Sequence, residues 1–199
     1  MSVTISPAEL ADVQPGMRLL TVADLAALPT DLPSGPVDYE LDNGRIVVMS
    51  PTGRRHGEVH SAIAAALHVQ GQQNGHGKAY VETGVILWRS PDRMVGPDAS
   101  FVCKRSLPVC ESPEGILETI PELVVEIRSK NDAITELDQK VADYLRAGVQ
   151  LVWIIDPESR TVIEHRPDAA PKTLAATESL VCEAIIPCFS LSLDELFRQ

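Results

Sequence analysis

Leu123-Val-Val-Glu-Ile127, an apolar run broken by one carboxylate, decides the fold that this sequence predicts. An amphipathic pattern over residues 132–147 follows it and ends at Gly148, a residue type that commonly terminates helices. A second apolar run comes next, at residues 150–155. Strand, helix and strand in this order predict a βαβ unit, whose two strands lie parallel and are joined by a right-handed crossover.

The segments around this unit add strands and helices on both sides. Asn43-Gly44 separates two apolar runs, at 37–41 and 45–49, and Asn-Gly between such runs is the strongest short signal of a β-hairpin. The other predicted elements are a short helix at 21–29, a long helix at 57–73, strands at 80–88, 97–103 and 161–165, a linker at 167–177 and a terminal helix at 193–197. The order predicts the α/β (α+β) class, with a mixed central sheet flanked by helices.

Length and composition indicate one globular domain. The chain has 199 residues and 21.6 kDa, with 44% hydrophobic and 23% charged residues, which excludes disordered and fibrous classes. No apolar run approaches the roughly 20 residues of a membrane span, and residues 1–16 lack the pattern of a secretory signal, so we expect a cytoplasmic protein. We expect a flexible tail over 1–16, a core domain over 17–166, and a C-terminal extension over 167–199 that packs on the core or on a dimer partner.

Charge restricts the function. The 17 basic and 28 acidic residues give a net charge of −11, which argues against non-specific nucleic-acid binding through clustered Lys and Arg. Acidic residues concentrate at 111–138, whereas basic residues concentrate at 45–60 and 89–105. This distribution is compatible with metal and phosphate chemistry, and equally with ordinary solvated surface charge.

Two other patterns point to no metal site. The four cysteines match neither zinc nor thioredoxin spacing, so we expect reduced thiols that pack as small hydrophobic groups. In His56-Gly-Glu-Val-His60 the glutamate stands one position too late for the H-E-x-x-H zinc motif, so we expect His56 to contact substrate or solvent instead.

Two carboxylates and one lysine carry the chemical signal. Asp98 begins one apolar strand, and Glu126 lies inside another, where an unpaired carboxylate is costly to bury. Carboxylates from neighbouring strands can share one Mg²⁺. Lys140 lies at the margin of the apolar stripe of the next helix, where its ammonium can point outward or toward the end of the strand that carries Glu126. In the second case it could orient a water or offset charge on a phosphoryl oxygen.

These residues resemble the PD-(D/E)XK nuclease superfamily, whose core runs helix, three strands, helix, strand. Residues 18–166 resemble more narrowly the Uma-two family of restriction-endonuclease-like proteins. Four ordered segments carry this resemblance: Asp38-Tyr-Glu-Leu-Asp-Asn-Gly-Arg45, Pro121-Glu-Leu-Val-Val-Glu-Ile127, Lys140-Val-Ala-Asp-Tyr-Leu-Arg-Ala-Gly148 and Val152-Trp-Ile-Ile-Asp-Pro157.

The resemblance implies a metal-binding hydrolase: an endonuclease with Mg²⁺ (or Mn²⁺) held by Glu40, Asp98 and Glu126, DNA as substrate, and Lys140 as the counterpart of the motif lysine. It also implies that Glu82 lies nearby, and that the protein is a homodimer. Arg128 occupies the usual lysine slot of the E-x-K motif, where an arginine can bind phosphate but cannot act as a base. The alternative is a catalytically silent nuclease fold that serves as a binding or assembly module, which the net charge of −11 favours.

Overall fold

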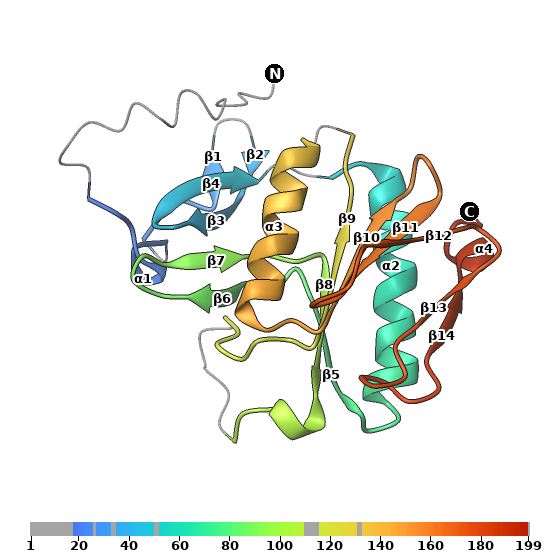
Figure 1. Cartoon of the computed structure of the whole chain (residues 1–199). Coiled ribbons are helices and arrows are strands. Elements are labelled where there is room, and N and C mark those ends of the chain that lie inside the picture. Colours follow the sequence, from blue (N-terminus) through green and yellow to red (C-terminus); the bar gives the residue numbers. More distant parts are fainter. Residues whose placement is uncertain are drawn as a thin grey trace.

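A six-stranded mixed sheet forms the centre of the molecule. The computed structural model describes residues 18–25, 27–32, 35–49, 52–109, 116–130 and 133–198, so the tail predicted over 1–16 lies outside the described residues. The strand order is β12-β11-β10-β9-β8-β5 (Figure 1). The strands are β5 (Gly77–Val81), β8 (Ala99–Cys103), β9 (Leu123–Ile127), β10 (Leu151–Asp156), β11 (Thr161–His165) and β12 (Lys172–Leu174).

The predicted βαβ unit is confirmed. β9 and β10 pair in parallel, with Val125 beside Trp153, while β8 pairs with β9 in the antiparallel sense. The connecting helix α3 (Ile134–Ala147) ends at Gly148, whose φ of 109° is the left-handed conformation that glycine adopts without strain. Helix α2, strands β5, β8 and β9, helix α3 and strand β10 therefore follow the restriction-endonuclease-like order.

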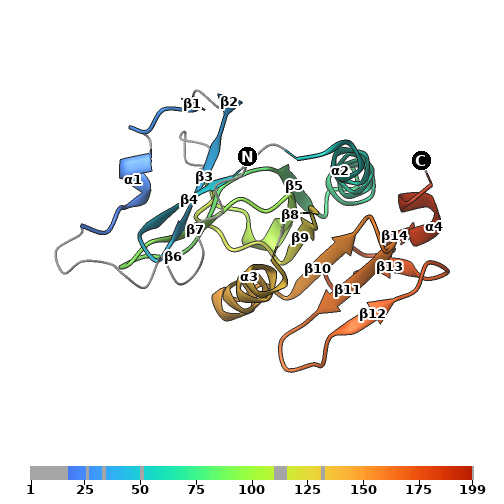
Figure 2. The same ribbon diagram turned by 90° about the horizontal axis from the view of Figure 1, so that it is seen from above.

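The two long helices pack on opposite faces of the sheet, because successive side chains of the buried strands point to opposite faces. Val125 and Trp153 pack in the cluster that contains residues of α2 (Arg54–Ala66), and α2 continues as the π-helix η2 (Leu67–Gln72). Val124 and Val152 pack instead against α3. Figure 2 shows α2 and α3 on either side of β9 and β10.

A second sheet of four strands, in the order β4-β3-β7-β6, stands beside the first. Its strands are β3 (Asp38–Asp42), β4 (Arg45–Met49), β6 (Val85–Trp88) and β7 (Arg93–Val95). The predicted hairpin is confirmed, since β3 and β4 pair across a turn in which Asn43 and Gly44 have φ of 50° and 80°.

The single strand predicted at 80–88 is wrong. β5 ends at Val81, Glu82 adopts a φ of 47°, and β6 begins at Val85 in the other sheet. The positive φ reverses the local backbone direction, and Gly84 follows it, so the chain leaves one sheet and enters the other.

The residues after β11 pack on the α2 side of the central sheet. The linker predicted at 167–177 contains β12, which extends that sheet. β13 (Ser179–Val181), β14 (Ser190–Ser192) and α4 (Leu193–Leu196) follow, and their side chains Leu180, Leu191 and Leu196 are buried in the α2 cluster. The remaining described elements are α1 (Val22–Leu25), β1 (Asp31–Leu32), β2 (Gly35–Pro36) and the 3-10 helix η3 (Lys104–Ser106).

The cysteines that the structure describes are free thiols. Cys103 and Cys182 are buried, Cys188 is exposed, and Cys110 lies outside the described residues. Burial raises the pKa of Cys103 to about 11 and that of Cys182 to about 12, so both remain thiols at neutral pH. None of the helices in the described part of the chain is long and apolar enough to cross a membrane.

Candidate active site

Asp98 and Glu126 lie side by side where β8 and β9 meet. The register pairs Ala99 with Val125, so Asp98, one residue earlier, lies beside Glu126. The backbone N–H of Ile127 donates to Asp98 Oδ2 at 2.6 Å. Glu126 is only 7% exposed, which makes it a carboxylate inside the protein and not one at a wet strand end.

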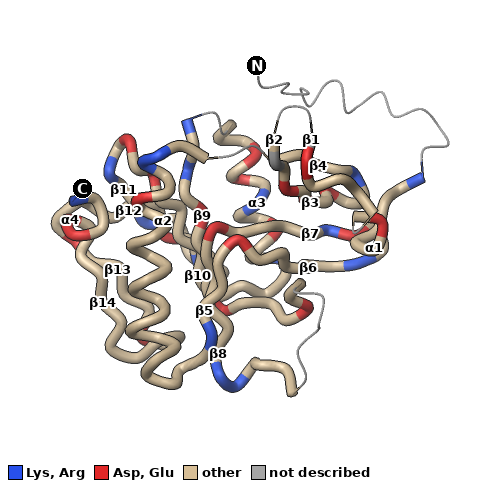
Figure 3. The backbone as a smooth tube through the Cα atoms, turned by 180° about the vertical axis from the view of Figure 1, so that it is seen from behind, with Lys and Arg blue, Asp and Glu red and all other residues tan. Residues whose placement is uncertain are grey.

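Lys140 joins Glu126 to Glu40, although β3 and α3 are far apart in sequence. Lys140 Nζ lies 2.8 Å from Glu40 Oε1 and 3.5 Å from Glu126 Oε1. The side chain therefore turns inward from the margin of α3. Acidic and basic positions lie close together around β3 and α3 in Figure 3. The structure brings together four residues that the sequence analysis proposed: Glu40, Asp98, Glu126 and Lys140.

Glu40 is fixed by groups that sequence reasoning missed. It is 2% exposed, and its Oε1 also accepts the backbone N–H of Gly96 at 3.0 Å. Arg93 Nη1 lies 3.9 Å from Glu40 Oε2, while Arg93 Nε donates to Asp143 Oδ2 at 2.8 Å. A buried Arg–Asp pair thus links β7 to α3 behind Glu40. One sequence signal for Asp143 was available, since it follows Lys140 by three residues on the same helix.

Tyr144, four residues after Lys140 on the same helix face, donates its hydroxyl to Glu126 Oε1 at 2.5 Å. Burial raises the pKa of Glu126 to about 7; Lys140 opposes this rise, whereas Asp98 and Glu40 add to it. Burial alone would lower the pKa of Lys140, but Glu126 and Glu40 outweigh it and hold the pKa above its ordinary value. Burial and Glu126 raise the pKa of Tyr144. The ammonium therefore stays charged, and the phenol stays protonated.

Helix α2 holds Asp98 from the other side. His56 Nε2 lies 3.0 Å from Asp98 Oδ1, and His60 Nε2 lies 2.8 Å from the backbone oxygen of Asp98. Glu82 donates its backbone N–H to the same oxygen at 3.1 Å, and its carboxylate lies 3.7 Å from His60 Nδ1. His56 thus contacts a proposed ligand and does not face solvent, and Glu82 borders the site through its backbone.

Arg128 turns away from these carboxylates. Its Nη1 donates to Asp156 Oδ2 at 2.9 Å, at the end of β10. In this structure Lys140, and not Arg128, is the cation that contacts Glu126.

The donor set at the site suits a hard divalent cation. Glu40 and Glu126 contact one ammonium and Asp98 lies beside Glu126, and the charges of Asp98 and Glu40 contribute to the raised pKa of Glu126. Mg²⁺ and Mn²⁺ prefer such oxygen ligands. Among the described residues, both hydrogen bonds that the Glu126 carboxylate accepts end on Oε1. As the side chains stand, no three His, Cys, Asp or Glu residues in the described ranges are close enough together to hold a metal ion. The ammonium of Lys140 lies between two of the proposed ligands instead.

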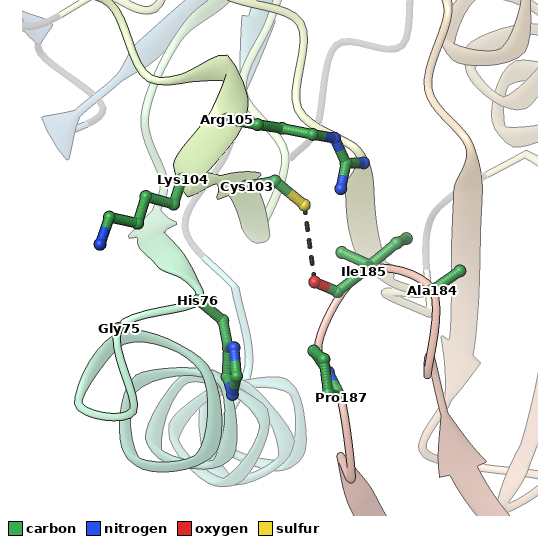
Figure 4. Close-up of a pocket in the computed structure, with 8 residues that line it drawn as sticks. All are labelled: Gly75, His76, Cys103, Lys104, Arg105, Ala184, Ile185 and Pro187. Atoms are coloured by element: carbon green, nitrogen blue, oxygen red, sulfur yellow. Dashed lines mark hydrogen bonds between the residues drawn. The ribbon is translucent and has the colours of Figure 1, made fainter.

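An open pocket of about 300 Å³ lies at the opposite end of β8. Cys103 Sγ donates to the Ile185 carbonyl oxygen within it, and the side chains of Lys104 and Arg105 point in different directions (Figure 4). Arg105 is paired with Glu122 at 3.4 Å. These cations do not converge on a common point, so the pocket adds nothing to the candidate site.

Comparisons with known proteins agree with this fold. Among solved structures, the chain is similar to a protein from Anabaena variabilis described as "a putative nuclease belonging to DUF820", with a TM-score of 0.74 and 19% identity over 90% of this chain and 98% of that one. This likeness shows a shared fold. No curated protein matches the sequence at a significant level. Residues 22–194 match the family model Uma2, described as "Putative restriction endonuclease". The match spans the whole candidate site and most of the chain, and the protein belongs to the Uma2 family.

Proposed function

We propose that this protein is a divalent-metal-dependent endonuclease that hydrolyses phosphodiester bonds of DNA. One observation carries the proposal: Lys140, half-buried, lies between the buried carboxylates Glu40 and Glu126, with Asp98 beside Glu126. A cluster of this kind is expensive to maintain as a mere structural element, because several charges lose their hydration together. Membership of a family described as a restriction endonuclease supports the same reaction class.

Glu40, Asp98 and Glu126 would hold Mg²⁺ or Mn²⁺. When bound there, the metal supplies an acidified water and polarises the scissile phosphate. His56 and the Ile127 N–H already fix both oxygens of Asp98, while Tyr144 orients Glu126. The carboxylates are therefore oriented before any ligand arrives, which reduces the cost of ordering them.

Lys140 would act on the substrate. Its ammonium neutralises Glu40 and Glu126 in this structure, and with a divalent cation on those carboxylates it becomes free to contact a water or a phosphoryl oxygen. The neighbouring carboxylates hold the lysine pKa above its ordinary value, so it serves as a positioning and charge-stabilising group and not as a base.

A binding or assembly module is the second candidate function. Two observations favour it: the net charge of −11, and the pairing of Lys140 with Glu40 at 2.8 Å, which satisfies the carboxylate without a metal. Such a fold would be stable and would have no nuclease activity.

Incubation of supercoiled plasmid and single-stranded DNA with Mg²⁺ or Mn²⁺ separates the two. The nuclease proposal predicts cleavage that Lys140→Ala abolishes and that a matched surface control, Lys172→Ala, leaves unchanged. Lys172 is exposed and pairs only with Glu178 among the described residues. Cleavage that survives Lys140→Ala would indicate contamination, and the absence of cleavage on every substrate would favour the module.

A further inference from the structure

Among the residues that the structure describes, strand β4 is an unpaired, apolar sheet edge. It is the outermost strand of the four-stranded sheet, and Ile46, Val47 and Val48 are 38%, 38% and 49% exposed. Edge strands usually carry lysine, proline or a bulge that prevents pairing with another chain. β12, the edge of the central sheet, is three residues long and begins with Lys172 directly after Pro171. The centre of β4 has no such protection.

The hairpin geometry determines which backbone groups of β4 face outward. A two-residue turn at Asn43-Gly44 makes the closing pair, Asp42 and Arg45, a hydrogen-bonded pair. The pattern alternates along the strand, so positions 45, 47 and 49 bond to β3, while positions 46 and 48 present their N–H and C=O groups to the outside. Within the described residues, none of these four outward groups has a hydrogen-bond partner in β3 or elsewhere.

We propose that β4 pairs with β4 of a second copy of this chain, antiparallel about a two-fold axis through Val47. The strand is self-complementary in this register. Ile46 lies opposite Val48 of the second copy, so each outward donor meets an outward acceptor and four hydrogen bonds form. Arg45 lies opposite Met49, so no like charges face each other and only apolar side chains occupy the centre.

The pairing joins two candidate sites on one sheet face. Glu40 is the cross-strand partner of Val47, and cross-strand partners share a face. Three strand spacings then separate Glu40 from its counterpart, about 14 Å. Two sites at this separation, related by a two-fold axis, suit a substrate with two antiparallel strands.

Most apolar side chains of the C-terminal residues are buried in their own chain, although Val181 is 51% exposed. The sequence predicted that this apolar tail covers either its own core or a second copy. In the structure Ile186, Phe189 and Leu193 are buried within the same chain. A second copy of this chain therefore needs another surface, and the exposed edge of β4 provides one.

Disulfide trapping tests the register without reference to nuclease activity. In a background with Cys110 and Cys188 replaced by Ser, Val47→Cys places two thiols opposite each other at a non-hydrogen-bonded pair, where cross-strand side chains are closest. Mild oxidation at tens of micromolar protein should give a covalent dimer of about twice 21.6 kDa. Ile46→Cys and Val48→Cys should each cross-link poorly alone and well when mixed.

A disruptive variant supplies the second arm. Val48→Pro removes an outward N–H but no hydrogen bond to β3, so circular dichroism should be unchanged while light scattering shifts from dimer to monomer. A monomer mass for the wild type at these concentrations would overturn the proposal. So would a dimer that persists with Val48→Pro and yields no cross-link through position 47, since another surface must then join the copies.

Discussion

Replacement of Glu126 by Gln should stabilise the protein, and the gain should depend on pH. In the metal-free protein the pKa of Glu126 is raised from 4.5 to about 7, by burial first and by Asp98 and Glu40 in addition. A raised carboxyl pKa means that the folded state holds the proton more tightly than the unfolded state does. The contribution of Glu126 to stability is therefore intact below pH 4.5 and is lost as the pH rises through 7.

The size of this effect follows from the shift. At 1.4 kcal/mol per pKa unit it corresponds to about 3 kcal/mol above pH 7. Glutamine keeps an oxygen for the hydroxyl of Tyr144 and the ammonium of Lys140 but carries no charge. We expect the variant to gain up to about 3 kcal/mol in free energy of unfolding at pH 8, and nothing at pH 4.5.

Urea unfolding from pH 4.5 to 8 in the presence of EDTA measures this difference. Glu136→Gln on the exposed face of α3 is the matched control and should change stability by less than about 0.5 kcal/mol at every pH. A Glu126→Gln effect that is constant with pH, or a destabilisation at pH 8, would refute the reasoning. When the replacement of a functional side chain makes a protein more stable, that side chain reduced the stability of the fold. Such a trade-off is typical of active sites.

Three further variants test the contacts around the site. Lys140→Met leaves two buried carboxylates without their ammonium. We expect the free energy of unfolding to fall by about 3 kcal/mol at pH 8, and by less at pH 5, in the same urea series. An equal loss at both pH values would be inconsistent with a titrating Glu126. Tyr144→Phe removes the hydroxyl from Glu126 and should cost about 1–3 kcal/mol in thermal unfolding, whereas an unchanged midpoint would show that the 2.5 Å bond contributes nothing. His56→Ala should weaken Mn²⁺ binding by roughly 10–100-fold in calorimetry because Asp98 loses its orienting contact, with partial rescue by His56→Asn. Unaltered affinity would assign His56 to packing alone.

The core of the fold was predictable because its signals are local. The apolar runs at 123–127 and 150–155, Gly148 between them, and the Asn43-Gly44 turn each encode their own element, and the structure confirms all of them. The break at Glu82 was missed because apolar residues continue on both sides of it. Strands β12, β13 and β14 have three residues each, too few to show a period of two.

The residues of the candidate site also fall into those with a local sequence signal and those without one. Asp98 and Glu126 stand out because a carboxylate within a buried strand is unusual, and Lys140 stands out by its position on the helix. Glu40 came only from the family resemblance, because nothing local shows that β3 reaches α3. The spacing of three from Lys140 marks Asp143 as a candidate, but its pairing with Arg93 forms across 50 residues, and no single-sequence pattern indicates that contact.

Binding of Mn²⁺ by isothermal calorimetry tests the central claim most directly. The wild type at pH 8 should bind the ion, and an Asp98→Ala, Glu126→Ala double variant should not, while Glu136→Gln binds as the wild type does. Because Glu126 must lose its proton to bind a cation, wild-type affinity should also fall as the pH is lowered through 7. The same Mn²⁺ affinity in the wild type and the double variant would contradict the account, since the ion would then bind elsewhere.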